Sequence, residues 1–328
     1  MKDGNKMENS KYKIALCQLD SQADKAANLE KISELTDKAA GMGAQVVCFP
    51  ENVVYGGEDK KNAAETIPGE TSVFMGALAK KHGIWIMTGS IQEIVENADA
   101  SESASVSKEI MANEDVAESA SENKESVDNA DTAENAAESN KAVPAQNEEK
   151  RIRNTLMLIN PYGEIVCKYS KLHMYDVEVE NGPSYKESDD ITPGENIVLV
   201  DTPFGRWGFA ICYDIRFPEL FRIMAVNGAE LIFTPASFSA ETGVCHWETI
   251  LRTRAIENSL YIAAPDQIGQ KPKTTAYGHS LIIDPWGNVI ADAGTDENVI
   301  IAEIDREYLQ SVRKQLPSLS NRREDIYG

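Results

Sequence analysis

The sequence predicts an α/β protein in which a large mixed β-sheet carries helices on its outer faces. Short apolar runs with strand character alternate along the chain with segments whose apolar residues recur at helical spacing. Outside one acidic segment, nothing in the composition divides the chain, so we expect a single domain over residues 12–328 after a flexible N-terminus at 1–11. A chain of 328 residues is long enough to bury a large core.

The N-terminal part predicts three strands and two helices. Residues 13–19 form an apolar run typical of a buried strand. Residues 25–41 place apolar side chains such as Leu29 and Ile32 at helical spacing, and the helix is expected to end at Gly41. The other elements expected before the acidic segment are strands at 45–49 and 84–91 and a helix at 71–82.

Two turns of similar chemistry mark the rest of the chain. Residues 160–163 (NPYG) separate the expected strands 155–159 and 164–168, and residues 284–288 (DPWGN) repeat the pattern. Further strands are expected at 197–201, 206–212, 231–236, 260–266, 279–284 and 299–305, and helices at 217–228 and 246–258.

The segment 95–150 differs from everything around it. It carries a formal charge of −11 out of a total of −21, and it contains no aromatic residue. Such a composition buries too little apolar surface to offset the entropy of ordering, so we expect a disordered insert within the domain. The alternative is an acidic segment that recruits a basic partner.

The overall charge excludes some classes of protein. Proteins that bind the phosphate backbone of nucleic acids need clustered Lys and Arg, and this chain has 32 basic against 53 acidic residues. The same charge argues against binding to an anionic membrane surface, and no apolar run approaches the roughly 20 residues of a membrane helix. Residues 1–13 lack the apolar stretch of a signal peptide, so we expect a cytoplasmic protein.

The cysteines and histidines predict neither a disulfide framework nor a metal site. The five cysteines are odd in number, widely spaced and form no CxxC motif. No two of the four histidines lie three or four residues apart, so we expect no metal.

Three segments place a reactive side chain at the end of a predicted strand, where α/β folds position their sites. They are Glu51 in FPEN, Lys171 in KYSKLH and Cys212 in ICYDIRFPEL. Each has an ordinary alternative: a solvated loop carboxylate, a surface lysine and a buried inert cysteine. Backbone N–H groups at the strand-to-helix turn after Cys212 would stabilise an anion and lower the pKa of its thiol.

In this chain order, the three motifs resemble the nitrilase superfamily of carbon–nitrogen hydrolases. The resemblance extends from Lys13 to Tyr327, apart from the acidic segment. It implies an α-β-β-α sandwich that forms a four-layer assembly as a homodimer. It also implies a Glu-Lys-Cys catalytic triad and no cofactor.

The resemblance assigns a role to each residue. Cys212 would attack the amide carbonyl to form a thioester, and Glu51 would move the protons and activate the hydrolytic water. The ammonium of Lys171 and the backbone N–H of Tyr213 would stabilise the oxyanion. The superfamily often carries a second glutamate, which corresponds here to Glu187 and would orient Lys171.

Further stretches resemble the branch that contains omega-amidase and deaminated glutathione amidase. They are residues 171–179, 243–248, 277–280 and 313–327. Omega-amidase hydrolyses 2-oxoglutaramate and 2-oxosuccinamate to ammonia and a dicarboxylate. The branch implies that Arg216 binds the substrate carboxylate, as the planar guanidinium suits, and that Phe238 and Thr242 line the acyl pocket. The alternative for Arg216 is an ion pair with Asp214 or Glu219. One departure is Val244-Cys245, where the branch usually has Pro-Ala.

The prediction is therefore an enzyme that acts on a small-molecule amide. Its rivals are a deaminated glutathione amidase, a nitrilase acting on a nitrile, and a Cys–His peptidase that uses one of the histidines. Adjacent Cys245 and His246 are discounted for that last role, because their side chains diverge on a helix. A scaffold that works through residues 95–150 is the alternative outside enzymes. Deleting that segment would distinguish the enzyme hypothesis from the scaffold hypothesis, since an enzyme is expected to keep its hydrolytic activity without it.

Overall fold

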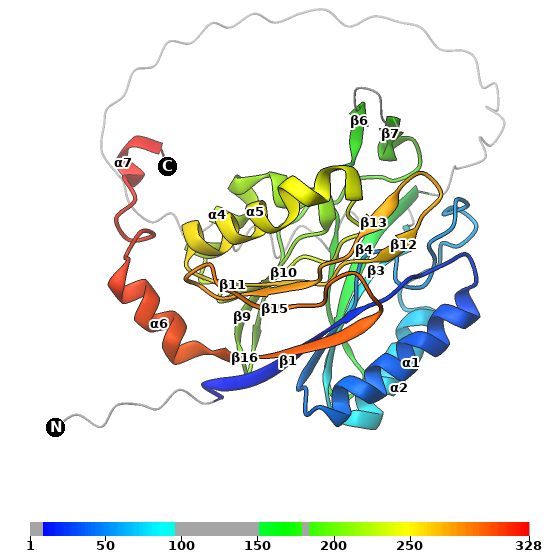
Figure 1. The fold of residues 1–328 in the computed structure, drawn as a ribbon, viewed down its shortest axis with the longest axis horizontal. Coiled ribbons are helices and arrows are strands. Elements are labelled where there is room, and N and C mark those ends of the chain that lie inside the picture. Colours follow the sequence, from blue (N-terminus) through cyan, green and yellow to red (C-terminus); the bar gives the residue numbers. More distant parts are fainter. Residues whose placement is uncertain (1–8, 96–150, 179–183, 328) are drawn as a thin grey trace, which may run out of the picture.

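The computed structural model describes residues 9–95, 151–178 and 184–327, and most of its strands form two six-stranded sheets (Figure 1). The first sheet has the order β16 (Asn298–Asp305), β1 (Lys11–Gln18), β2 (Val46–Cys48), β3 (Trp85–Val95), β4 (Arg151–Ile159) and β5 (Ile165–Ser170). The second has the order β15 (Val289–Asp292), β14 (Leu281–Ile283), β11 (Tyr261–Ala264), β10 (Leu231–Phe233), β9 (Gly205–Phe209) and β8 (Leu199–Thr202). In both sheets, a parallel centre is flanked by antiparallel strands.

Helices cover the outer face of each sheet. Figure 1 shows α1 (Lys25–Gly41) and α2 (Glu70–His82) on one side of the molecule, and α4 (Pro218–Val226) and α5 (Ala240–Asn258) on the other. Three apolar clusters fill the two helix–sheet layers and the space between the sheets. The expected α/β class and the α-β-β-α sandwich are thus confirmed, with two sheets in place of one large sheet.

The central strands are continuous apolar runs in the sequence because their side chains alternate between two buried layers. In β1, Ile14 and Leu16 point into the layer between the sheets, whereas Ala15 and Cys17 point towards α1 and α2. Successive side chains of a strand face opposite sides, and both sides are covered here.

Short elements complete the chain around this core. They are the hairpins β6 (Asp176–Glu178) with β7 (Ser184–Lys186) and β12 (Ile268–Gln270) with β13 (Thr275–Tyr277), the 3₁₀ helices η1 (Glu187–Asp189) and η2 (Cys212–Arg216), and the C-terminal helices α6 (Arg306–Gln315) and α7 (Glu324–Tyr327). The sequence analysis predicted none of these, nor strand β15. In the part of the chain that is described, no helix combines the length and the apolarity that crossing a membrane requires.

Two predicted elements differ from the structure for identifiable reasons. The strand expected at 206–212 ends at Phe209, because the carboxylate of Asp214 accepts the N–H of Ile211 at 2.8 Å and the chain turns into η2. The helix expected at 246–258 begins at Ala240. Gly243 lies inside that helix, where a Cβ atom would stand 2.3 Å from the ring of Tyr277, so this glycine permits close packing and does not break the helix.

Strands β3 and β4 frame the acidic segment. Val95 is the last residue of β3 and pairs with Arg151, the first residue of β4. The segment predicted at 95–150 therefore overlaps the strand by one residue, and residues 96–150 lie outside those described. At the N-terminus, β1 already begins at Lys11, the last residue of the stretch expected to be flexible, and residues 1–8 lie outside the described part.

Candidate active site

Three strand ends bring the predicted reactive residues into one cavity of about 450 Å³. Glu51 follows β2 and Lys171 follows β5 in the first sheet, while Cys212 follows β9 in the second. The cavity thus lies beyond the C-terminal ends of strands from both sheets. All eight predicted site residues line it: Glu51, Lys171, Glu187, Cys212, Tyr213, Arg216, Phe238 and Thr242.

Lys171 lies between two carboxylates. Its Nζ is 3.1 Å from Oε1 of Glu51 and 2.8 Å from Oε2 of Glu187. Only 2% of the Lys171 side chain is exposed. Burial alone would lower its pKa, but Glu187 and Glu51 together outweigh that effect and hold the pKa of Lys171 well above its ordinary value. The side chain is therefore a fixed cation.

Glu187 keeps its negative charge because Lys171 lies beside it. Burial would raise its pKa, but Lys171, with a smaller effect from Lys60, lowers the pKa below its usual range. The backbone N–H of Tyr175 also donates to Oε2 of Glu187 at 2.7 Å. This carboxylate is held from two directions while it holds Lys171.

Glu51 receives two further donors that the sequence analysis missed. Asn154 on β4 donates from Nδ2 to Oε1 at 2.7 Å, and the backbone N–H of Ser237 donates to Oε2 at 2.9 Å. With Lys171, the described part of the chain supplies two donors to Oε1 and one to Oε2. No local motif marks Asn154, since it lies 103 positions from Glu51 in the chain.

Cys212 begins η2 in a strained conformation. Its φ of 47° lies in the left-handed region that non-glycine residues rarely adopt. Burial raises the pKa of its thiol well above the ordinary value, and Glu51 raises it further against the opposing effect of Lys171. The expectation that the turn after the strand lowers the thiol pKa is therefore wrong, because burial outweighs it. The resting side chain is a protonated thiol.

Asp214 joins the segment that carries Cys212 to the segment that carries Lys171. It is fully buried, and its Oδ2 accepts the hydroxyl of Tyr169 at 2.7 Å as well as the N–H of Ile211. Its Oδ1 accepts the backbone N–H of His173 at 3.0 Å and lies 2.7 Å from Nδ1 of the same residue. Tyr169 and His173 each stand two residues from Lys171, so Asp214 fixes that lysine relative to the cysteine.

Aromatic rings hold Arg216 at the cavity wall. Its guanidinium carbon lies 5.7 Å from the ring centre of Tyr213 and 5.3 Å from that of Phe238. Nη2 is 3.5 Å from Oγ1 of Thr242, and Nη1 is 3.2 Å from Nδ1 of His246. The alternative ion pair with Asp214 is not formed, because that carboxylate is buried and bound elsewhere.

The histidines do not form a dyad with Cys212. Among the described residues that line the cavity, none is a histidine. The side chains of His82, His173 and His279 pair with Asp37, Asp214 and Asp292, and that of His246 contacts Arg216. Within residues 9–95, 151–178 and 184–327, no three His, Cys, Asp or Glu side chains come together as a metal-binding group.

Comparison with known proteins gives a consistent picture. The family model described as carbon-nitrogen hydrolase matches residues 13–109 and 114–314. The chain is 33% identical over 322 residues to omega-amidase NIT2 of Danio rerio, covering 97% of both proteins. It is also 33% identical over 316 residues to a deaminated glutathione amidase of Synechocystis sp., covering 95% of this chain and 98% of the relative. Among solved structures, Saccharomyces cerevisiae Nit3, a member of branch 10 of the nitrilase superfamily, superposes with a TM-score of 0.74 at 27% identity, covering 98% of this chain and all of that one.

Proposed function

The chain belongs to the carbon–nitrogen hydrolase family and is a hydrolase of amide C–N bonds, and on that premise we propose that it acts as an omega-amidase. In this proposal, it cleaves a small amide that bears a carboxylate, such as 2-oxoglutaramate or 2-oxosuccinamate, to a dicarboxylate and ammonia. The observation that carries the proposal is the convergence of Glu51, Lys171 and Cys212 in one cavity, with Arg216 on its wall.

The first half of the reaction forms a thioester. Because the Cys212 thiol is protonated at rest, its attack on the amide carbon requires a base. Glu51 lines the same cavity, and among the described residues its Oε2 has one donor, the N–H of Ser237, which leaves a lone pair to take the proton. Glu51 then gives the proton to the leaving nitrogen as the C–N bond breaks, and ammonia departs.

The second half regenerates the enzyme. Glu51 takes a proton from water, the hydroxide oxygen attacks the thioester carbon, and the C–S bond breaks. The product leaves as the carboxylic acid, and the thiolate regains its proton from Glu51. Atoms and charges balance as amide plus water giving carboxylic acid plus ammonia, which in neutral solution become carboxylate and ammonium.

Both tetrahedral intermediates carry a negative oxygen, which Lys171 would stabilise together with the backbone N–H of Tyr213. Glu51 and Glu187 fix the ammonium of Lys171 before the substrate binds, so this group need not reorganise during the reaction. Glu187 is the positioning partner, because it contacts Lys171 through both oxygens.

Arg216 supports a substrate with a carboxylate. Among the described residues, its polar partners are Thr242 and His246, and neither is a carboxylate. Two rings hold the guanidinium in place, so its N–H groups can meet a carboxylate bidentately. Phe238 supplies one of these rings and Thr242 one of the polar contacts at the acyl end.

A second candidate is a deaminated glutathione amidase. The relative of that name is as similar to this chain as the omega-amidase relative. The cavity of about 450 Å³ is also larger than a short oxo-acid amide needs.

Ammonia release from 2-oxoglutaramate, deaminated glutathione and a simple nitrile, with Cys212→Ala as the blank, tests these proposals. Cysteine-dependent release that is fastest with 2-oxoglutaramate supports the omega-amidase. Preference for deaminated glutathione overturns it in favour of the second candidate, and preference for the nitrile overturns both.

A further inference from the structure

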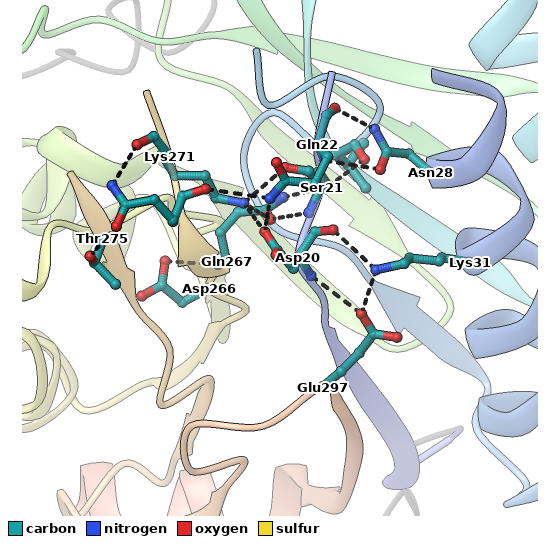
Figure 2. Close-up of polar contacts among 12 residues, drawn as sticks. Asp20, Ser21, Gln22, Asn28, Lys31, Asp266, Gln267, Lys271, Thr275 and Glu297 are labelled. Atoms are coloured by element: carbon teal, nitrogen blue, oxygen red, sulfur yellow. Dashed lines mark hydrogen bonds and ion pairs between the residues drawn. The ribbon is translucent and has the colours of Figure 1, made fainter. Parts of the chain in front are cut away.

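The turn of the β12–β13 hairpin closes one side of the cavity. Residues 271–274 of this turn line it. The mechanism uses neither of the two lysines among them, Lys271 and Lys273, and Lys271 is the buried one, with only 8% exposed. In Figure 2, its side chain reaches from the hairpin towards Asp20 and Ser21, which follow strand β1.

Every N–H of the Lys271 ammonium already has a protein acceptor. Its Nζ donates to Oδ1 of Asp20 at 2.7 Å, to the carbonyl of Ser21 at 2.9 Å and to Oε1 of Gln267 at 3.1 Å. An ammonium has three donors, so this one has none left for a substrate. These contacts indicate that Lys271 holds other residues of the protein in place and does not bind substrate.

Lys271 and the backbone N–H of Ser21 together determine which way the amide of Gln267 faces. Oε1 of Gln267 accepts from Lys271 and also from the backbone N–H of Ser21 at 2.9 Å. Both partners can only donate, so the oxygen must lie on that side. The amide nitrogen therefore faces the hydroxyl of Ser21 at 2.9 Å and the backbone carbonyl of Glu51 at 3.0 Å.

The bond from Gln267 is the shorter of two hydrogen bonds that fix the main chain of Glu51. The N–H of Glu51 donates to the carbonyl of Ala236 at 3.3 Å, whereas its carbonyl accepts from Gln267 at 3.0 Å. Gln267 is buried, with 1% of its surface exposed, so the pair is shielded from competing water.

We propose that Lys271 is a positioning residue that acts through Gln267 to hold the peptide of Glu51, and thereby its carboxylate, in place for proton transfer. This inference rests on the proposed function, in which Glu51 is the base. Removing the ammonium would take away one of the two donors to Oε1 of Gln267 and loosen the amide that donates to the Glu51 carbonyl.

The surroundings of Lys271 are built to keep it in this position. Gln22 donates to the same oxygen of Asp20 at 2.7 Å, and Lys31, paired with Glu297, donates to its carbonyl at 3.2 Å (Figure 2). Gly269 lies against Asp20 with a φ of 79°, and a Cβ atom there would stand 2.4 Å from that carboxylate. The glycine therefore allows the hairpin to approach Asp20 closely enough for Lys271 to reach it.

Kinetics of Lys271→Met on the full chain test the proposal, with the amide that the wild type hydrolyses fastest. We expect kcat to fall about tenfold or more and KM to change less than about twofold. A positioned base contributes roughly 10²- to 10⁴-fold to the rate, and displacing it would lose part of that factor. Lys81→Met is the matched control, because Lys81 lies the same 2.7 Å from a carboxylate, that of Asp37, but on the exposed face of helix α2. A rise in KM at unchanged kcat would show substrate binding by Lys271 and would overturn the proposal.

A double-mutant cycle shows whether Lys271 works through Gln267. If it does, the double variant Lys271→Met, Gln267→Met has the same kcat as Gln267→Met alone. If the loss in the double variant equals the product of the two single losses, Lys271 does not act through Gln267. If Lys271→Met fails to fold, Gln267→Glu replaces it. This variant keeps an acceptor for Lys271 but places a carboxylate oxygen, which cannot donate, next to the carbonyl of Glu51. An unchanged kcat in Gln267→Glu overturns the proposal.

Glu51→Gln, measured alongside, separates the two levels of the account. If Glu51→Gln is inactive and Lys271→Met is fully active, only this inference fails. If Glu51→Gln retains full activity, the proposed function itself is wrong.

Discussion

The side-chain amide of Asn154 donates to Oε1 of Glu51 across 2.7 Å, on the same oxygen that the ammonium of Lys171 contacts. Two donors on one oxygen hold the carboxylate plane, and in the proposed mechanism the other oxygen, Oε2, accepts the thiol proton. Both Asn154 and Glu51 are buried, so water cannot replace a lost donor easily.

We therefore expect Asn154→Leu, which keeps the approximate shape and removes the donor, to lower kcat about 10- to 100-fold, within the range that a general base contributes. Asn62→Leu is the matched control, since Asn62 donates to the carboxylate of Asp59 at 2.6 Å on the surface. Steady-state kinetics of both variants check the expectation. Equal kcat values for Asn154→Leu and the wild type would show that this amide does not orient the base.

Glu187 should set the alkaline limit of activity. It holds the pKa of Lys171 above its ordinary value, and without it the opposing effect of burial gains weight. In Glu187→Gln, the pKa of Lys171 is therefore expected to fall, and the ammonium is lost at lower pH. The alkaline limb of kcat/KM against pH should move to lower pH than in the wild type. An unmoved limb with reduced kcat would mean that Glu187 acts in some other way.

Asp214 should matter for stability and for activity together. Its carboxylate accepts from Ile211, Tyr169 and His173, and an amide in its place would turn a donor towards one of these donors. We expect Asp214→Asn to lose about 1–3 kcal/mol of the free energy of unfolding, measured by urea denaturation, and to lower kcat in the folded fraction. Tyr169→Phe removes a single donor and should lose less. The reverse order would contradict the role given to Asp214.

Arg216 should discriminate substrates by charge. Replacing it with Met removes charge-assisted bonds worth about 1.5–3 kcal/mol, so we expect kcat/KM for a carboxylate-bearing amide to fall roughly 10- to 150-fold. The value for a neutral amide of similar size should change little. Arg252→Met, on the exposed side of α5, is the control. An equal loss for both substrates would assign Arg216 to the framework of the site.

Local patterns predicted the main elements of the fold and the three motifs of the site. The apolar runs of β1 and β2 mark buried strands, and Glu51, Lys171 and Cys212 each lie within three residues of a strand end, so one pass along the chain finds them. The short hairpin β12–β13 and helix α6 were missed, because they bury few side chains; in α6, only Leu309 and Val312 are buried. Their positions depend on the rest of the fold.

The supporting residues of the site could not be found in this way. Gln267 lies 216 positions from Glu51 in the chain and Asn154 lies 103 positions from it, and neither is part of a local motif. Lys271 resembles any surface lysine until the fold places it beside Asp20. Such contacts between distant segments exist only once both sheets are assembled.

The most direct test of the account is ammonia release by Cys212→Ala compared with Cys245→Ala. Both variants remove a single thiol, but Cys212 lines the cavity whereas Cys245 lies exposed on α5. With the best amide substrate and equal amounts of folded protein, the account predicts that Cys212→Ala falls to the uncatalysed rate and that Cys245→Ala keeps wild-type activity. Retained activity in folded Cys212→Ala would contradict nucleophilic catalysis by this cysteine.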